Sequence, residues 1–197
     1  MDIKNEFPEI GNDFRLVVQT CHELYKNQYV CAYDGNVSIR YGEYVLATPT
    51  HLCKRDVSED DLIIVNLNGE KVFGKREPTS ELKVHLAVYN KVSAAKAVVH
   101  GHPIYTTAIY RDGKNPNSSV LTESQDTFKQ IPIVPAHRPG SALLAEDVGK
   151  VMNLETQVCI MEKHGAVTWG QSLEEAYFLL ESLERLAKTE YLIGSMK

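Results

Sequence analysis

The sequence VSIRYGEYVLAT, residues 37–48, contains two short runs of apolar and β-branched residues that meet at Gly42. Such runs on either side of a turn residue predict an antiparallel β-hairpin. Two further segments, residues 62–73 and 157–170, show the same arrangement around an Asn-Gly pair and around the sequence EKHG. Since strands joined by short turns pair antiparallel, we expect a mostly antiparallel sheet.

Apolar residues at helical spacing occur between and around these hairpins. They predict helices over residues 14–26, 82–90, 104–111, 141–152 and 172–193. In the second of these, Pro78, Thr79 and Ser80 precede the first turn, and we expect Thr79 or Ser80 to cap the helix. Residues 95–102, AKAVVHGH, predict another strand, which ends at Pro103.

The order of these elements indicates the fold class. Helices and strands are mixed along the chain, and residues 131–135 add one more short strand. Because hairpins connect several strands, we predict an α/β fold of the α+β type, with helices packed on the faces of a central, mostly antiparallel sheet. No repeat or linker interrupts the sequence, so residues 1–197 are predicted to form a single domain.

Composition excludes several classes of protein. With 43% hydrophobic and 24% charged residues, the chain is typical of a soluble globular protein. It has no apolar run of about 20 residues that would span a membrane, and its N-terminus lacks the pattern of a secretory signal, so we expect a cytoplasmic protein. The net charge of −5 argues against nucleic-acid binding. This charge does not argue against a phosphorylated metabolite as a ligand, because a few N–H groups and hydroxyls can bind a single phosphate.

The four cysteines are scattered along the chain, at Cys21, Cys31, Cys53 and Cys159, and none forms a CxxC pair. We therefore expect reduced thiols that fill the core, rather than disulfides or a structural zinc site.

Three histidines form a candidate metal site. His100 and His102 are two residues apart in a predicted strand, so both side chains point to the same face. Taken alone, such a pair can also be satisfied by hydrogen bonds at the end of a strand. His164, at the predicted bend of the 157–170 hairpin, adds a third imidazole. Three neutral imidazoles and one open position are typical of a catalytic zinc site.

The remaining histidines and Glu81 have simpler interpretations. We expect His22, in a helix, and His137, in a loop, to be structural or exposed. His85 follows Glu81 by four residues and is expected to hydrogen-bond with it along the helix. Glu81 itself is either an acidic residue favoured by the helix dipole, or a general base or fourth metal ligand.

Five motifs, DGNVSIR, LATPT, PTSELKVH, AVVHGHP and EKHGAVTWG, occur in this order over nearly the whole chain. In these motifs the sequence resembles the class II aldolase/adducin family. That family includes L-fuculose-1-phosphate aldolase, L-ribulose-5-phosphate 4-epimerase, methylthioribulose-1-phosphate dehydratase and the structural head domain of adducin. The resemblance implies that His100, His102 and His164 bind zinc. It also implies that Glu81 ligates zinc at rest and acts as the acid/base once substrate displaces it.

The resemblance extends to the substrate and the assembly. It implies that the substrate phosphate is held by Gly35, Asn36, Thr50, Thr79 and Ser80. A Gly-Asn turn and a helix N-terminus both offer N–H groups to an anion, which agrees with these assignments. Glu123 matches an acid/base of the dehydratases, and a surface glutamate is the alternative. Family members form C4 tetramers, which implies a homo-oligomer here. The last predicted helix has an apolar stripe that serves either an interface or the core; it consists of Leu179, Leu180, Leu183, Leu186 and Ala187.

Some positions differ from L-fuculose-1-phosphate aldolase. His51 replaces a glycine beside the phosphate, and Tyr33 and Asp34 replace a hydroxyl residue and a small one. No tyrosine lies near Leu121, and the chain ends without the C-terminal extension of the aldolase and the epimerase. These differences concern the substrate rather than the zinc site.

The resulting functional prediction is a zinc-dependent aldolase, that is, a lyase. It would cleave a ketose 1-phosphate such as L-fuculose 1-phosphate to dihydroxyacetone phosphate and an aldehyde. The alternatives are a dehydratase that uses Glu123, an epimerase, and a non-catalytic module like that of adducin.

Overall fold

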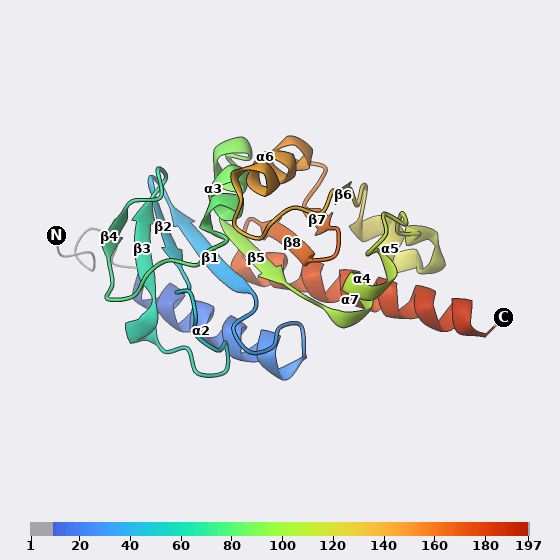
Figure 1. Cartoon of the computed structure of the whole chain (residues 1–197), viewed down its shortest axis with the longest axis horizontal. Helices are drawn as coiled ribbons and strands as arrows, with labels where there is room; N and C mark the ends of the chain where they lie inside the picture. Colours follow the sequence, from blue (N-terminus) through green and yellow to red (C-terminus); the bar gives the residue numbers. More distant parts are fainter. Residues whose placement is uncertain (1–9, 197) are drawn as a thin grey trace.

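One eight-stranded sheet runs through the protein, whose computed structural model describes residues 10–196 (Figure 1). The strand order is β4-β3-β2-β1-β5-β8-β7-β6, and only the β6–β7 pair is parallel. The strands are β1 (Asn36–Tyr41), β2 (Tyr44–Ala47), β3 (Ile63–Asn66), β4 (Lys71–Phe73), β5 (Ala97–Gly101), β6 (Ile133–Val134), β7 (Val158–Met161) and β8 (Gly165–Gly170). The predicted α/β fold with a mostly antiparallel sheet is confirmed.

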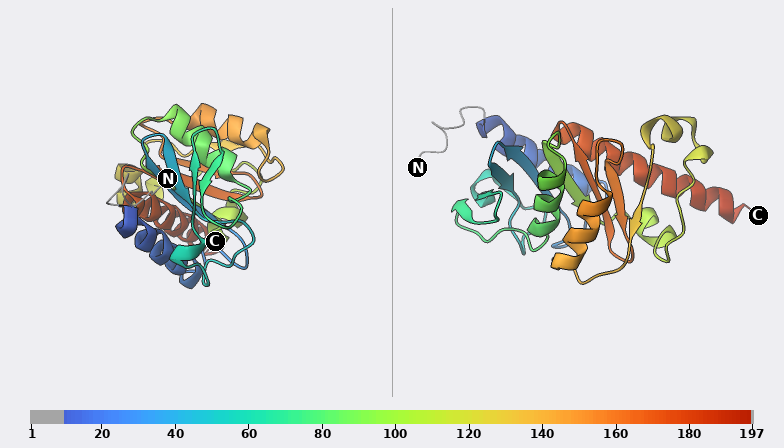
Figure 2. Two further views of the ribbon diagram at one scale, coloured as in Figure 1. Left: turned by 90° about the vertical axis from the view of Figure 1, so that its left-hand side faces the viewer. Right: turned by 90° about the horizontal axis from the view of Figure 1, so that it is seen from above.

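Helices cover both faces of the sheet. They are α2 (Ile10–Lys26), α3 (Leu82–Lys91), α4 (Ile104–Ile109), α5 (Thr122–Thr127), α6 (Ala142–Val151) and α7 (Leu173–Ser195), with two 3₁₀ helices, η1 (Glu59–Asp61) and η2 (Ser118–Val120). Seen along the sheet, α3 and α6 lie on one side, and α2 and α7 lie on the other (Figure 2). The arrangement is therefore three-layered.

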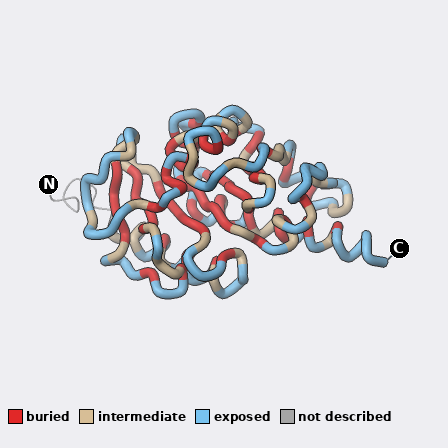
Figure 3. Tube along the Cα trace, viewed as in Figure 1, coloured by how far each residue is buried: buried red, intermediate tan, exposed pale blue. Residues whose placement is uncertain are grey.

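The strands divide the core into two apolar clusters because successive side chains point to opposite faces. In β5, Ala97 and Val99 face the layer of α2 and α7, whereas Val98 faces the layer of α3 and α6. Apart from the exposed edge strand β4, the strands are mostly buried along their length (Figure 3). A rigid, two-sided core of this kind holds the ends of the central strands in fixed positions.

The apolar stripe on α7 belongs to the core rather than to an interface. Its members are at most 7% exposed: Leu179, Leu180, Leu183, Leu186 and Ala187. The helix begins where the side chain of Ser172 accepts a hydrogen bond from the N–H of Glu175. No helix in the described part of the chain is both long and apolar enough to cross a membrane. Residues 1–9, which belong to the segment searched for a secretory signal, lie outside the described residues.

Several local expectations need correction. The first helix begins at Ile10, before the predicted Phe14. Neither Thr79 nor Ser80 caps α3; the N–H of Leu82 bonds to the carbonyl of Thr79 in a turn, which puts Glu81 at the N-cap position. The sequence TESQDT forms α5, a helix that periodicity cannot predict because the segment contains no apolar side chain.

The cysteines are all free, as predicted, but only two of them fill the core. Cys21 and Cys159 are buried, whereas Cys53 is partly exposed and Cys31 is exposed. The expectation that all four pack inside was wrong for Cys31, which lies in the turn before β1 and donates its S–H to Asp34.

Candidate active site

The central strand β5 brings the candidate site together. His100 is buried and lies opposite Asn36 of β1 on one side and Val167 of β8 on the other. Gly101 follows it, and a side chain at Gly165, the first residue of β8, would collide with the Gly101 carbonyl oxygen. Glycine at position 165 therefore allows β5 and β8 to approach closely at the edge where His102 and His164 lie.

The three histidines predicted to bind a metal converge. Their ring centroids are 4.8–4.9 Å apart with interplanar angles of 63–69°, and one ligand atom of each lies within 4.8 Å of the other two. Nε2 of His102 is 3.0 Å from Nε2 of His100. Two nitrogens bound at about 2.0–2.1 Å around a tetrahedral zinc ion are about 3.3 Å apart. The three side chains could therefore hold one metal ion.

The hydrogen bonds around the rings fit this role. Nδ1–H of His100 donates to the carbonyl of Ala166 at 2.9 Å, which leaves Nε2 with a free lone pair. Nδ1 of His102 is 3.3 Å from a carboxylate oxygen of Asp34, the second partner that metal-binding histidines commonly have. Nδ1 of His164 is buried without a hydrogen-bond partner among the described residues. A buried imidazole with an unsatisfied nitrogen is suited to bind a metal ion.

Electrostatics keeps the three rings neutral, as metal ligands must be. Burial, reinforced by His102 and His164, lowers the pKa of His100 well below its usual value. Burial lowers the pKa of His102, and the nearby carboxylate of Asp34 opposes that change. Burial, followed by the effect of His102, lowers the pKa of His164 to about 4.

Glu81, at the N-cap position of α3, is a buried carboxyl group. One of its oxygens, Oε2, has no hydrogen-bond partner in the described structure. Burial raises the pKa of Glu81 to about 7, and the backbone N–H of Gly140 opposes this rise. Glu81 does not belong to the histidine group whose ligand atoms lie within 4.8 Å of one another. A carboxyl group of this pKa can both take up and release a proton near neutral pH.

The segments assigned to the phosphate lie side by side. A bridge between Pro49 and Pro78 joins the LATPT and PTSE loops, and the N–H of Thr79 donates to the carbonyl of Thr48. Thr50 is partly buried, Thr79 is buried and Ser80 is exposed. Gly35 has a φ of +71°, in the left-handed region that favours glycine, and it directs the chain into Asn36.

Not all predicted residues have the expected surroundings. Glu123 lies exposed in the first turn of α5, outside the histidine group. His85 does not hydrogen-bond with Glu81; it is fully buried and contacts Ser38 and Asn36, because its ring points from α3 towards the sheet. His22 and His137 have structural partners, the carbonyl of Val57 and the carboxylate of Asp147.

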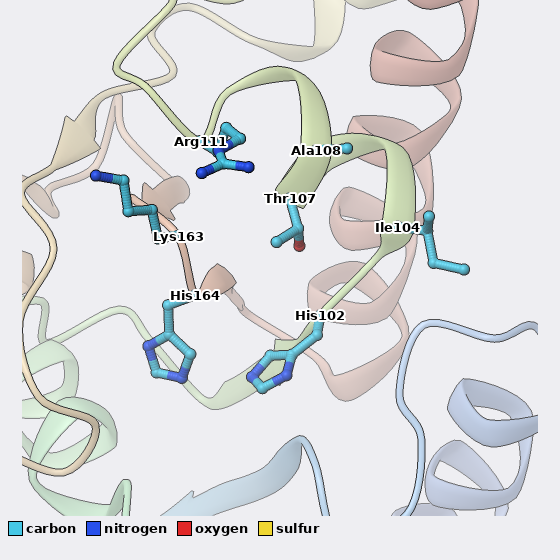
Figure 4. Close-up of a pocket in the computed structure, with 7 residues that line it drawn as sticks. All are labelled: His102, Ile104, Thr107, Ala108, Arg111, Lys163 and His164. Atoms are coloured by element: carbon cyan, nitrogen blue, oxygen red, sulfur yellow. The ribbon is translucent and has the colours of Figure 1, made fainter.

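A pocket of about 540 Å³ opens beside the histidines (Figure 4). Its lining consists of His102, Ile104, Thr107, Ala108, Arg111, Lys163 and His164. In the figure, Thr107 of α4 points into the space between Arg111 and the two histidines. The hydroxyl of Thr107 is buried and has no hydrogen-bond partner in the described residues. The pocket therefore offers two cationic residues, Arg111 and Lys163, next to the candidate metal site.

The sequence did not identify Asp34, Gly140, Thr107, Arg111 or Lys163 as site residues. Asp34 was visible as a difference from L-fuculose-1-phosphate aldolase, which is a usable signal. Gly140 stands in a Pro-Gly pair, which is a turn signal in the sequence, and its φ of +71° and close approach to the Ser80 carbonyl show why glycine is required there. Arg111 and Lys163 carry no such signal.

Known proteins with a similar sequence or fold indicate the family of this chain. The family described as "Class II Aldolase and Adducin N-terminal domain" matches residues 15–191. An L-fuculose phosphate aldolase of Methanococcus maripaludis is 37% identical over 91% of this chain and 97% of its own. A 3-oxo-tetronate 4-phosphate decarboxylase of Pectobacterium atrosepticum is 31% identical over 88% of this chain and 81% of its own. The crystal structure of an L-fuculose-1-phosphate aldolase from Thermus thermophilus has a TM-score of 0.81 and 26% identity, covering 93% and 94% of the two chains.

Fold and site together define a lyase with a histidine group that could bind a metal. The chain belongs to the class II aldolase and adducin family, and it is a sugar-phosphate enzyme of that family.

Proposed function

We propose that this protein is a zinc-dependent aldolase that cleaves a ketose 1-phosphate, such as L-fuculose 1-phosphate, to dihydroxyacetone phosphate and an aldehyde. The main support is the convergence of three neutral imidazoles, since three histidines with an open position are typical of catalytic zinc. The names of the relatives that are 37% identical agree with this substrate class.

In this proposal His100, His102 and His164 hold the zinc ion, which would act as a Lewis acid on the substrate carbonyl. Asn36, Thr79 and Ser80, together with Gly35 and Thr50, bind the phosphate through N–H groups and hydroxyls.

Glu81 is the acid/base in the same proposal. The C4 hydroxyl releases its proton to solvent as the bond between C3 and C4 breaks, and its oxygen becomes the carbonyl of the aldehyde. The electrons of the broken bond move towards the C2 carbonyl, and Glu81 then delivers a proton to C3 of the three-carbon fragment. The pKa of about 7 supports this role, because the carboxyl group is then protonated in a large fraction of molecules at neutral pH.

The test is product analysis with candidate ketose phosphates in the presence of zinc. Triose phosphate plus aldehyde supports the aldolase, loss of water supports the dehydratase, and an isomeric pentose phosphate supports the epimerase. Glu81→Gln should retain zinc and lower kcat about 100- to 10,000-fold. Glu123→Gln distinguishes the alternatives further: it should leave an aldolase nearly unchanged and inactivate a dehydratase. Purified protein with neither bound metal nor any of these activities would contradict the proposal and favour the adducin-like module.

A second candidate, decarboxylation of a phosphorylated 3-oxo acid, is favoured by the pocket of Figure 4. Arg111 and Lys163 would suit a carboxylate beside the metal, and several relatives at 30–31% identity are named as such decarboxylases. Release of CO₂ from a 3-oxo acid 4-phosphate, abolished by Arg111→Gln, would support this reaction over aldol cleavage.

Assembly and location are also part of the proposal. By resemblance to the family, we propose one domain that forms a homotetramer in the cytoplasm. Light scattering on the purified protein tests the tetramer, because a monomer or dimer would contradict it.

A further inference from the structure

His85 is a buried titratable group to which the proposed mechanism gives no role. It lies on α3, is 0% exposed, and faces β1. Its Nδ1 is 2.7 Å from the hydroxyl of Ser38, and its Nε2 is 2.6 Å from Oδ1 of Asn36. Burial lowers the pKa of His85 to about 3, and no charged partner opposes this effect. The ring is therefore neutral, with one donor and one acceptor nitrogen.

The hydroxyl groups of Ser38 and Tyr89 determine which ring nitrogen of His85 carries the proton. The hydroxyl of Ser38 is 2.7 Å from that of Tyr89. Tyr89 is buried, and its oxygen also faces the backbone N–H of Val98, which can only donate. Among the described residues, Ser38 is thus the acceptor left for the Tyr89 proton. Ser38 then donates to Nδ1 of His85, which leaves the ring proton on Nε2.

The chain of donors ends on Asn36. Because Nε2–H of His85 is a donor, it needs the amide oxygen of Asn36 as its acceptor. The NH₂ group of Asn36 is then the part of the amide that remains for another partner. Asn36 lies beside Gly35 and opposite His100 in the β1–β5 pair, so its side chain is on the same face of the sheet as that of His100.

We propose that His85 is a positioning residue that holds the Asn36 amide with its NH₂ group towards the substrate phosphate. This inference rests on the proposed function, in which Asn36 binds that phosphate. In the opposite orientation the amide would direct its oxygen at a phosphate anion and its NH₂ group at the N–H of His85. Both contacts are repulsive, so the buried chain from Tyr89 to Asn36 sets the site for an anion before substrate arrives.

Two substitutions at His85 separate this role from simple packing. In His85→Gln, the side-chain NH₂ group reaches the position of Nε2 and can still donate to Asn36. In His85→Asn, the shorter amide keeps a polar atom near Ser38 and leaves the oxygen of Asn36 without its donor. Inorganic phosphate binding, measured by calorimetry on the zinc-loaded protein, and KM and kcat for the cleaved ketose 1-phosphate are the readouts.

We expect His85→Asn to weaken phosphate binding and raise KM about tenfold, with zinc content and kcat close to wild type. His85→Gln should restore both values to within about threefold. Equal affinities in wild type and His85→Asn would overturn the inference while leaving the phosphate site in place. Equal losses in both variants, in proportion to their loss of thermal stability, would also overturn it. Wild-type protein that binds no phosphate would instead overturn the proposed phosphate site and the inference with it.

One measurement needs no variant. Two-bond ¹H–¹⁵N correlation spectra report which ring nitrogen of a histidine carries the proton. The expected result is a His85 ring protonated on Nε2 between pH 6 and 8. A ring protonated on Nδ1 would reverse the hydrogen-bond chain and overturn the orientation of Asn36.

Discussion

At the candidate metal site, one neighbouring side chain contacts a histidine that is predicted to bind the metal. Nε2 of His102 faces Nε2 of His100, and Nδ1 of His102 faces the carboxylate of Asp34. The same carboxylate accepts a hydrogen bond from the thiol of Cys31. Asp34 is a difference from L-fuculose-1-phosphate aldolase, yet it takes up a position that supports a ligand. Residues of this kind act through the histidine that they contact.

Replacing Asp34 should weaken metal binding. Asp34→Asn removes the negative charge beside Nδ1 of His102 and should raise the zinc dissociation constant about 10- to 100-fold. The measurement is competition with a chromophoric chelator at constant pH. Cys31→Ala is the matched control, because Cys31 touches the same carboxylate without touching His102. An unchanged dissociation constant in Asp34→Asn would show that the carboxylate does not support the ligand.

At the scale of elements, the site depends on how strands β5 and β8 meet. These strands pair antiparallel, and Gly165 allows the turn that carries His164 to lie against the end of β5. The backbone of that turn is itself unusual, since Lys163 has a φ of +58°. His100 therefore comes from β5, His102 from the segment just after it, and His164 from the turn before β8.

A methyl group at position 165 should disturb this junction. Gly165→Ala places a carbon against the carbonyl of Gly101, and we expect a loss of about 1–3 kcal/mol in the free energy of unfolding together with weaker zinc binding. Urea denaturation and the chelator assay measure the two effects. Gly194→Ala is the control, because the space around this helical glycine is open and alanine should be neutral or slightly stabilising. Similar results for both variants would show that the junction does not require glycine at position 165.

Periodicity made the elements of the sheet predictable. Alternating apolar residues predicted the hairpins of β1–β2, β3–β4 and β7–β8, and the same rule put His100 and His102 on one face. The polar helix α5 and the exact start of α3 depend on tertiary contacts, which no local pattern encodes. The same holds for His85: its i,i+4 spacing from Glu81 indicated a contact along the helix, whereas burial against Ser38 and Asn36 determines its partners.

At the scale of the whole molecule, buried neutral histidines couple stability to pH. The folded pKa of His85 is about 3 and that of His164 is about 4, while in the unfolded chain both return to about 6.5. Below pH 6.5 the unfolded chain binds protons that the folded protein does not. The stability from these groups is therefore complete above pH 6.5 and is lost as pH falls, down to about pH 4 for His164 and about pH 3 for His85.

The metal-free protein should lose stability in mild acid. Between pH 6.5 and 5.5 the unfolded imidazole goes from half to almost fully protonated, so each of these two histidines lowers the free energy of unfolding by about 1 kcal/mol and the pair by about 2 kcal/mol. Urea denaturation over this range measures the slope. In His85→Gln the slope of the free energy of unfolding against pH should correspond to the uptake of about one proton fewer on unfolding. A slope that is the same in wild type and His85→Gln would contradict the assigned protonation of His85.

The junction of β5 and β8 also has a kinetic consequence, because His100 and Ala166 are 66 positions apart in the chain. Contacts of such long range form late in folding, after the entropy of a large loop has been lost. The histidines would then be separated in the rate-limiting step, so zinc should leave the refolding rate unchanged and slow unfolding. Stopped-flow refolding with and without zinc tests this; a faster refolding rate with zinc would mean that the ion guides the chain. In the expected case, newly made protein completes its fold first and takes up its metal afterwards.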